Sequence, residues 1–592
     1  MIKNYIILTP KKLTWPNLKR NRIYVSTEDV IENFTNYNIL KRNAYFQNHR
    51  WINKKILRQD LKYIYYLNKK IIKHIYKKLN KIHKTKYSEK FWFILISPWS
   101  LIFLQIYFDR WNSIKSILNK KKGKFFVNSI IYNKPEILTP LDTKEFLYFF
   151  RHDDWNQFIG QKILNFNKKK VIIKNHKYNF SENNLKNNKN FSSPNQSFLN
   201  KLVFFIFGLF NRKKYNYFLY KTYLGFWKEL LLSLKLGQLP IFEEFNLKIK
   251  NKKLNFKIRN DIKKHIPNSN AFENTLTQIF SEQMPIIFLE KFNKLENFVN
   301  KKCNLPRYPK KIFSSSSLWG DTVINYYIAK SLEKNTKLYY SQHGGTYGIA
   351  QTHFQTEYET NLAHKYLTWG WKNKNKKNII SFGIIKNLKH FKANQNNNGN
   401  LLLMVNKRHK YTTLLNSSLN EGIDYIKYLK FYSKFLFNLK KDIKNETVIR
   451  HQPGSNFQEN ADFFGHIDKN FKVDNSKSLQ NAFKASKIVV HTLNSTSIIE
   501  SLFYNIPTVI ILDKKKNPLT PQGEKTFKFL KKNKIFFDNP NKAAKFINEI
   551  WNSKINDWWL SNNTQNAVRN FKANFARKKI DVVTDLKNML SN

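Results

Sequence analysis

Apolar positions along the chain follow two patterns: short continuous runs ended by polar turns, and longer stretches with helical spacing. The first short run, Tyr5–Leu8, is ended by Thr9 and Pro10 and predicts a strand that opens an α/β domain. From Trp51 to Lys90, apolar residues recur at helical spacing with lysines between them, which predicts surface helices. The polar stretch 165–197 predicts a surface loop, and the pattern of residues 215–236 is again helical.

A strand–helix–strand unit is predicted from residue 311 onward. Lys311–Ser314 is a short apolar run, and Lys337–Ser341 is the next one. Between them, Asp321 is placed as the N-cap of a helix that continues to Leu332. Strand–helix–strand units build parallel sheets, so this region indicates an α/β fold.

A second α/β series follows the polar stretch Asn394–Asn400, which predicts an interdomain linker. Strands are predicted at Leu401–Val405, Thr447–Arg450, Lys487–His491 and Thr508–Leu512. We therefore expect two Rossmann-like domains facing each other across a cleft, the first with helical insertions. Residues 1–393 form the acceptor-side domain, residues 394–555 the nucleotide-donor domain, and residues 556–592 a helical tail that crosses back to the first domain.

An uncharged run of 18 residues, Phe91–Phe108, is at the lower length limit of a membrane-spanning helix. Pro98 interrupts it in the middle and Gln105 in its second half, which favours buried core helices. A membrane span and a contact within one leaflet are the alternatives. No signal peptide is recognisable, so we expect a cytoplasmic protein. A peripheral contact with the inner face of the membrane is compatible with that location.

Composition and charge narrow the classes of function. Apolar residues make up 41% of the 592 positions, which excludes a disordered chain. The formal net charge of +64 suggests an anionic partner, but only 14 of the 104 basic residues are Arg and the lysines are scattered. Lys, Asn, Ile, Phe and Tyr all have AT-rich codons, so genome bias accounts for much of the charge. We expect no nucleic-acid partner.

Candidate chemistry gathers where predicted strands end. The turn Gln342-His343-Gly344-Gly345 combines a histidine suited to act as a base with glycines that let a ligand approach. Arg450 and His451 end a strand in the second series and suit a diphosphate. The structural alternatives are a tight turn with a surface histidine and a basic loop in a lysine-rich chain.

A third cluster lies between His491 and Asp513. Its hydroxyl-rich turn, Asn494-Ser495-Thr496-Ser497, opens a helix whose N-terminus suits phosphates, and Glu500 is placed to bind ribose hydroxyls. The alternative is an ordinary capped helix. Two weaker candidates are Asp154, a possible general base in a polar turn, and Arg408, which follows the first strand of the second series. No metal-binding motif is recognisable, and the one cysteine excludes a disulfide framework.

Three segments resemble a transferase family of bacterial O-antigen and surface-polysaccharide clusters. They are LTPKKLTWP, PWSLIFLQIYFDRW and SQHGGTYGIAQTHFQTEYETNLAHKYLTWGW, which begin at residues 8, 98 and 341. The resemblance covers nearly the whole chain, and QHGG-x-YG is its most specific part. The second half is similar to GT-B glycosyltransferases and to teichoic-acid-type glycerophosphotransferases.

The resemblance implies roles for several residues. Glu500 and Pro507 have the GT-B spacing in which the glutamate meets the donor ribose. His343 matches a catalytic histidine–glycine turn of the glycerophosphotransferases, and His451 matches their second histidine. The chain departs from GT-B enzymes at Ile506, where glycine is usual, and in lacking their glycine-rich N-terminal loop.

We therefore expect a metal-independent, GT-B-like glycosyltransferase without a cofactor. Its partners would be a nucleotide-sugar donor and a glycan or lipid-linked glycan acceptor of the O-antigen type. His343, His451 and Asp154 are the predicted catalytic residues. The predicted donor-binding residues are Gln342, Gly344, Gly345, Arg408, Arg450, Asn494, Ser495, Thr496, Ser497 and Glu500. The alternatives are polyol-phosphate transfer and a non-catalytic, membrane-associated scaffold of the polysaccharide machinery.

Overall fold

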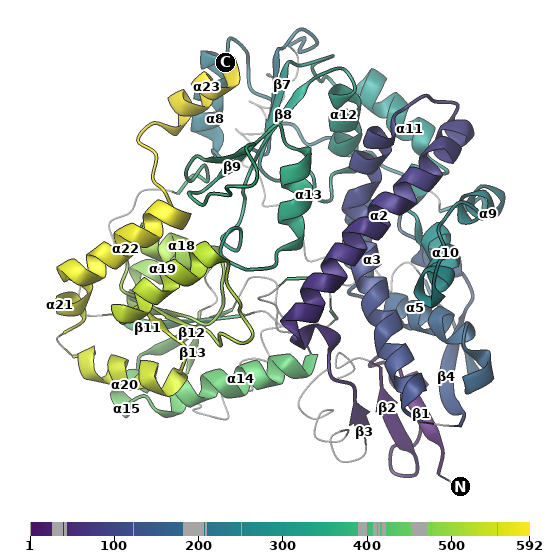
Figure 1. Cartoon of the computed structure of the whole chain (residues 1–592), viewed down its shortest axis with the longest axis horizontal. Coiled ribbons are helices and arrows are strands. Elements are labelled where there is room, and N and C mark those ends of the chain that lie inside the picture. The colour runs from purple at the N-terminus through teal and green to yellow at the C-terminus, as the bar shows by residue number, and fades with distance from the viewer. Residues whose placement is uncertain are drawn as a thin grey trace.

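Three parallel β-sheets organise the chain, each with helices packed on its faces (Figure 1). The computed structural model describes residues 2–26, 40, 44–121, 123–181, 207, 210–249, 252–388, 399–406, 411–412, 415–416, 422–451, 471–474, 476, 478–552 and 554–592. Each sheet with the helices connecting its strands is called a unit, numbered first to third along the chain.

The first sheet has the strand order β3-β2-β1-β4-β5. Its strands are β1 (Asn4–Ile7), β2 (Arg22–Val25), β3 (Ala44–Phe46), β4 (Phe125–Tyr132) and β5 (Val171–Tyr178). The connection from β4 to β5 contains α4 (Thr143–Phe149) and α5 (Asp153–Asn165). The order reverses between β1 and β4, which makes a crevice at the carboxyl ends of those strands.

The second sheet has the linear order β10-β9-β8-β7-β6. Its strands are β6 (Tyr217–Tyr220), β7 (Lys311–Ser314), β8 (Lys337–Ser341), β9 (Lys365–Thr368) and β10 (Ile379–Ser381). Its helices are α8 (Phe226–Lys235), α9 (Phe256–Lys263), α10 (Ala271–Gln283), α11 (Phe292–Asn297), α12 (Thr322–Leu332) and α13 (Phe354–Leu362). Asp321 caps α12 by accepting a hydrogen bond from Ile324 N, which confirms the predicted N-cap.

The third sheet has the order β13-β12-β11-β14-β15-β16, with its reversal between β11 and β14. Its strands are β11 (Asn400–Val405), β12 (Thr447–His451), β13 (Lys472–Val473), β14 (Ser486–His491), β15 (Thr508–Ile511) and β16 (Phe536–Phe537). Its helices are α14 (Gly422–Phe437), α15 (Lys441–Asn445), α17 (Leu479–Lys484), α18 (Thr496–Phe503), α19 (Pro521–Lys532), α20 (Pro540–Ile550) and α21 (Ile555–Leu560).

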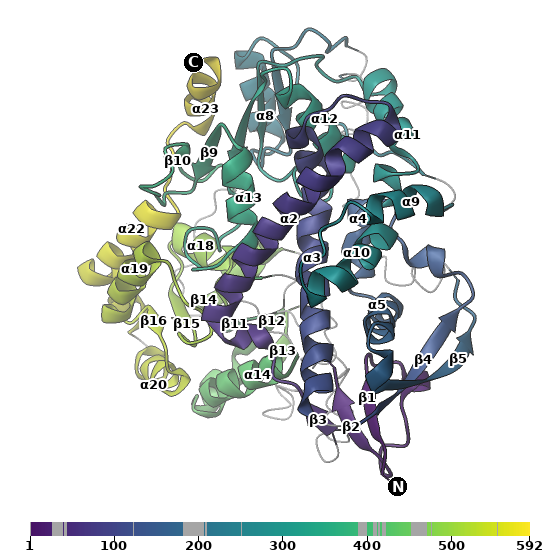
Figure 2. The same cartoon turned by 45° about the vertical axis from the view of Figure 1, so that its right-hand side comes forward.

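A long helical hairpin, α2 (Lys54–His83) and α3 (Glu89–Lys120), runs from the first sheet to the second unit (Figure 2). Within the described residues, α3 is the one helix long and apolar enough to cross a membrane, and 94% of its most apolar window is buried inside the protein. Pro98 lies inside this single continuous helix. The run Phe91–Phe108 is therefore core, as the pattern favoured, although it forms one helix rather than a pair.

The C-terminal helix α22 (Asn562–Phe575) packs on α18 and α19 of the third unit, and the chain then crosses to the second unit, where α23 (Val582–Ser591) packs on α8. Arg577 N donates to Trp369 O at 2.8 Å, and Ile384 N donates to Arg577 O at 2.9 Å. Val582 and Leu586 share an apolar cluster with side chains of the second sheet. Figure 1 shows α23 beside α8, at the end of the molecule opposite the N-terminus.

The carboxyl ends of the second and third sheets face each other. The segment after β8 contacts the third unit, where Gln351 N donates to Pro518 O at 2.9 Å and Thr520 N donates to Ile349 O at 2.9 Å. Two facing sheets of this kind make the GT-B-like α/β arrangement that the sequence predicted. The predicted linker lies largely outside the described residues.

The N-terminal half differs from the prediction in having two parallel sheets where one was expected within residues 1–393. Two local interpretations were wrong. Residues 171–178, predicted as loop, form the edge strand β5, whose pattern is mixed because only part of its surface is buried. Residues 217–220, predicted as helix, form the edge strand β6, a largely buried apolar run of four residues that is too short to be told from a helix by its pattern.

Candidate functional site

The turn after β8 is held in shape by the side chain of Gln342. Its Nε2 donates to Gly344 O at 2.7 Å, and its Oε1 accepts from Trp369 N at 3.0 Å and from Trp371 Nε1 at 2.8 Å. Three of the four hydrogen bonds that a buried amide can make are thus made to the turn and to the segment after β9. Gln342 therefore fixes the backbone that carries His343.

Gly345 brings this turn against the N-terminus of α18. Its backbone N–H donates to Thr496 Oγ1 at 3.0 Å. A Cβ at this glycine would lie 2.7 Å from both Ser495 O and Thr496 N, so no other residue fits without moving the third unit. The strand ends of two sheets meet at this contact, as the sequence motifs suggested.

His343 is enclosed by aromatic and acidic side chains. Tyr347 Oη lies 3.2 Å from His343 Nε2, and Glu359 Oε1 lies 3.8 Å from His343 Nδ1. Burial lowers the pKa of His343 to about 4, against the opposing effect of a backbone hydrogen bond with Ser315. The imidazole is therefore neutral at pH 7 and able to accept a proton.

Glu359, on α13, is the functional candidate that sequence reasoning missed. The carboxyl group is fully buried and accepts hydrogen bonds from Trp319 Nε1 at 2.7 Å, Tyr347 Oη at 3.0 Å and Tyr366 Oη at 2.9 Å. Burial raises its pKa to about 8. A glutamate on a short helix is ordinarily exposed, so periodicity does not mark it. Its position inside the longest segment of the family resemblance is the signal that points to it.

The N-terminus of α18 carries a chain of hydroxyl and imidazole groups. Ser495 is the N-cap, but its hydroxyl lies 2.7 Å from Ser497 Oγ and makes no capping bond to the backbone. Ser497 Oγ lies 3.2 Å from His491 Nδ1, and His491 Nε2 lies 2.9 Å from Ser501 Oγ. His491, at the end of β14, was not assigned a role from the sequence, and burial lowers its pKa to about 3.

Asn494 is the polar residue at this terminus whose hydrogen bonding is incomplete. Its side chain is 4% exposed, and within the described part of the chain its Oδ1 has no hydrogen-bond partner. It follows β14, at the point where the strand order of the third sheet reverses and α/β sheets bind ligands. A buried unsatisfied amide beside a helix N-terminus fits a ligand that supplies the missing partner.

Glu500 lies one turn into α18 and forms an ion pair with Lys386, which follows β10 of the second unit. The two side chains therefore join the second and third units. The ribose role of Glu500 stays a prediction, and it requires a ligand that binds beside this ion pair or displaces Lys386.

Arg450 and His451 end β12. Arg450 forms an ion pair with Asp474 and donates to Ser476 Oγ at 3.0 Å, so the described contacts hold the guanidinium within the third unit. His451 is buried, and burial lowers its pKa to about 4. Their predicted contacts with the diphosphate are not tested by this geometry. Arg408 lies outside the described residues.

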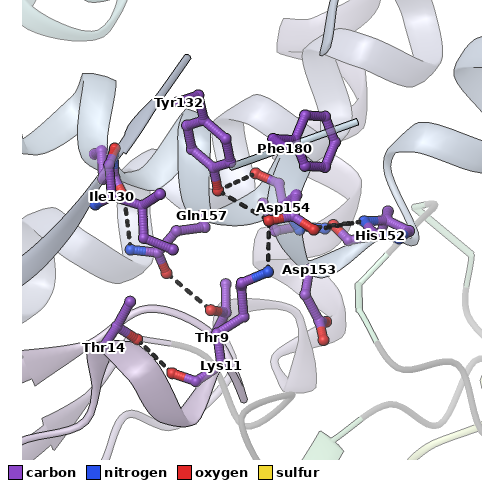
Figure 3. Close-up of polar contacts among 12 residues, drawn as sticks. Thr9, Lys11, Thr14, Ile130, Tyr132, His152, Asp153, Asp154, Gln157 and Phe180 are labelled. Carbon is purple, nitrogen blue, oxygen red and sulfur yellow. Dashed lines mark hydrogen bonds and ion pairs between the residues drawn. The ribbon is translucent and has the colours of Figure 1, made fainter. Parts of the chain in front are cut away.

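Asp154 belongs to the first unit, whereas His343 follows β8 of the second, so the two residues expected in one domain are placed by two different sheets. It lies at the N-terminus of α5 and accepts from Lys11 Nζ at 2.6 Å and from Tyr132 Oη at 3.2 Å. His152 Nδ1 is 3.4 Å from its other oxygen. Figure 3 shows the lysine, tyrosine and histidine converging on this carboxylate.

Solved structures with a related shape are distant from this chain. Acinetobacter baumannii MurG is 10% identical, and the match covers 53% of this chain and 79% of that one with a TM-score of 0.29. The spinosyn rhamnosyltransferase SpnG is 10% identical, and the match covers 51% of this chain and 76% of that one with a TM-score of 0.28. S. aureus MnaA, solved with UDP, is 9% identical, and the match covers 75% of this chain and 94% of that one with a TM-score of 0.28. TM-scores this low mark only a remote similarity.

The sequence comparisons are more decisive. No curated protein matches the chain. The model of the LIC12162 family transferases, in contrast, matches residues 4–590, which is nearly the whole chain and includes all three sheets. The chain therefore belongs to the LIC12162 family of transferases.

Proposed function

We propose that the protein is a glycosyltransferase that moves a sugar from a nucleotide donor to a hydroxyl group of an O-antigen-type surface polysaccharide. The observation that carries the proposal is the contact of the His343 turn with the N-terminus of α18. That contact joins a neutral, half-buried base to a helix terminus suited to phosphate, which are the two groups that we assign to sugar transfer from a nucleotide.

The donor's diphosphate is assigned to the third unit. The positive end of the α18 dipole, the hydroxyls of Ser495, Thr496 and Ser497, and the unsatisfied amide of Asn494 all lie at the carboxyl end of β14. Glu500 is assigned to the ribose, one turn along the same helix. Arg450 and His451, at the end of β12 in the same sheet, are assigned to the leaving group.

The transfer step is assigned to His343. Its imidazole takes the proton from the acceptor hydroxyl while that oxygen forms a bond to the anomeric carbon of the donor sugar. The bond between the anomeric carbon and the diphosphate oxygen breaks, and the nucleoside diphosphate leaves with the bonding electrons. Tyr347 Oη contacts the imidazole and is itself held by Glu359, so the two residues position the base.

The proposal includes catalysis without a metal ion, a cytoplasmic location and a peripheral contact with the membrane that holds a lipid-linked acceptor. The net charge of +64 supports attraction to an anionic membrane surface. A second function, polyol-phosphate transfer, is supported by the half-buried histidine after β8 and the buried histidine at the end of β12, each with its pKa lowered to about 4. The two functions differ in whether a sugar or a phosphoalcohol reaches the acceptor.

A thermal-shift panel of UDP, GDP, CMP, CDP and dTDP and their sugar derivatives tests the donor assignment. Binding to the folded state raises the melting temperature. We expect a shift with one nucleotide series that is lost in Glu500→Gln and kept in Glu549→Gln, a matched change at an exposed glutamate of α20.

Transfer itself is then measured as donor-dependent product on a lipid-linked glycan, with and without EDTA. Mass analysis of the product separates sugar transfer from polyol-phosphate transfer. No shift with any nucleotide, together with binding to anionic vesicles, would favour the non-catalytic scaffold instead.

A further inference from the structure

A cavity of about 380 Å³ lies where the first and second units meet. One wall is α4 with its N-cap, from Asp142 to Tyr148. The opposite wall belongs to the second unit: Tyr220 and Lys221 at the end of β6, Glu244–Leu247, and Trp319–Val323 before and within α12. Parallel sheets bind ligands at the carboxyl ends of their strands, and this volume is in the range of small-molecule sites. Among the described residues, its lining lies within 142–323 and includes none from the third unit.

Trp319 links the lining of the cavity to the residues around His343. The indole Nε1 donates to Glu359 Oε1 at 2.7 Å, and the ring packs against Phe354 and Tyr358 with centroid distances of 5.1 Å and 5.2 Å. These contacts fix the ring, and its exposed part lines the cavity. A rigid aromatic surface therefore stands between the cavity and the residues that hold the base.

The segment after β6 makes a second connection. Tyr220 and Lys221 line the cavity, and Tyr223, a little further along, has its ring 6.4 Å from the ring of His343 at an interplanar angle of 17°. A ligand in the cavity is thus bordered by the same segment that borders the base.

The charges that line the cavity balance. Its basic side chains are Lys144, Arg151 and Lys221, and its acidic side chains are Asp142, Glu244 and Asp321. Asp321 Oδ2 accepts from Tyr220 Oη and Lys221 Nζ, each at 3.0 Å, so part of this charge is already paired. A phosphate would meet the carboxylates, and a purely apolar ligand would leave the charged groups without water. A neutral ring with several hydroxyls satisfies the polar groups and lays its C–H face on the aromatic rings.

We propose that this cavity binds a neutral sugar ring of the acceptor glycan, with Trp319 as the platform and Asp142 and Asp321 as hydrogen-bond acceptors for its hydroxyls. The identification of that sugar as the acceptor rests on the proposed function. The cavity is assigned to the acceptor because Trp319 and the segment after β6 link its lining to the residues around His343, and because its lining comes from the first and second units rather than from the unit assigned to the donor.

Saturation-transfer NMR tests the site without any donor. The probes are the methyl α-glycosides of glucose, galactose, rhamnose and N-acetylglucosamine, with glucuronate and glucose 6-phosphate as charged counterparts. Asn246→Trp and Lys144→Trp place an indole in the cavity from opposite walls, and both residues are exposed, so the fold is kept. Asn541→Trp, at an exposed position of α20, is the matched control.

We expect at least one neutral glycoside to bind the wild type, with an affinity about tenfold lower in both filled variants and unchanged in the control. Absence of binding to the wild type, equal binding to the filled variants, or loss confined to the charged sugars would each overturn the proposal. The nucleotide-induced thermal shift is measured on the same variants. Its absence from the wild type would count against the donor assignment and would leave the cavity result standing.

Discussion

In both the first and the third sheet the strand order reverses beside the first strand, between β1 and β4 and between β11 and β14. The polar groups at these two reversal points differ in how completely they are paired. At the first sheet, Lys11, Tyr132 and His152 surround the carboxylate of Asp154. At the third sheet, Asn494 keeps a buried amide oxygen without a partner among the described residues. The common topology creates two crevices, and the pairing of charges distinguishes them.

We call the reversal point of the first sheet, with Asp154, the first edge, and that of the third sheet, with Asn494, the third edge. The same fold thus supplies one structural edge and one edge suited to bind a ligand. Removing one partner of an internally satisfied ion pair destabilises the fold, because it leaves the other charge buried and unpaired. An unsatisfied polar group beside a helix N-terminus is a cost that a bound ligand can offset. We therefore expect substitutions at the first edge to change stability, and substitutions at the third edge and the facing His343 turn to change binding and rate.

The largest expected effect is on rate, at the turn that faces the third edge. His343→Gln removes the base, so we expect kcat to fall by about 100-fold or more with nucleotide binding unchanged. The measurement is the initial rate of nucleoside diphosphate release. His364→Gln, at an exposed position before β9, is the matched control and should keep full activity. Full activity in His343→Gln would remove the histidine from the mechanism.

The next effect is on stability, at the first edge. Asp154→Ala leaves the ammonium of Lys11, whose side chain is only 14% exposed, without its carboxylate. We expect the free energy of unfolding to fall by about 3 kcal/mol in a urea titration. Asp585→Ala breaks the more exposed pair with Lys579 and should cost less than about 1 kcal/mol. If Asp154→Ala instead abolished transfer at unchanged stability, Asp154 would be catalytic, as its sequence suggested.

A smaller effect is expected at the third edge. Asn494→Ala removes the buried amide that awaits a partner, so nucleotide affinity should fall by about tenfold, as titration calorimetry would show. The melting temperature without ligand should stay the same or rise, because a buried unsatisfied group is lost. Asn541→Ala at an exposed site is the control. A fall in ligand-free stability with unchanged affinity would make Asn494 a structural residue.

The smallest effect concerns pH. Burial raises the pKa of Glu359 to about 8, so between pH 4.5 and 8 the folded state holds a proton that the unfolded state has released. Its contribution to stability is therefore complete below pH 4.5 and is lost as the pH rises to 8. Glu229 and Asp142, with pKa values raised to about 7 and 6, act in the same direction at lower pH.

The difference between the wild type and Glu359→Gln isolates Glu359, because the other groups titrate alike in both proteins. From pH 7 to 8 the wild type should lose up to about 1.4 kcal/mol of stability relative to Glu359→Gln. Thermal unfolding at closely spaced pH values measures the difference, with Glu549→Gln as the exposed control. Parallel pH profiles for the wild type and Glu359→Gln would show that the carboxyl does not titrate in this range.

Local patterns predicted much of the second and third sheets. β7 and β8 have the predicted bounds, α12 begins after its predicted cap, and β11, β12, β14 and β15 lie within a residue or so of their predicted positions. These strands are buried on both faces and so appear as continuous apolar runs, which are the clearest sequence signal for a parallel sheet.

The sequence alone determined the α/β class, the position of His343 at a strand end and the hydroxyl-rich entry to α18. The tertiary structure decided that the N-terminal half contains two sheets, that Asp154 and His343 lie on different ones, and that Glu359 is buried behind the base. The reason is the range of the interactions. Periodicity and capping depend on residues a few positions apart, whereas burial, ion pairing and the shift of a pKa depend on groups that only folding brings together.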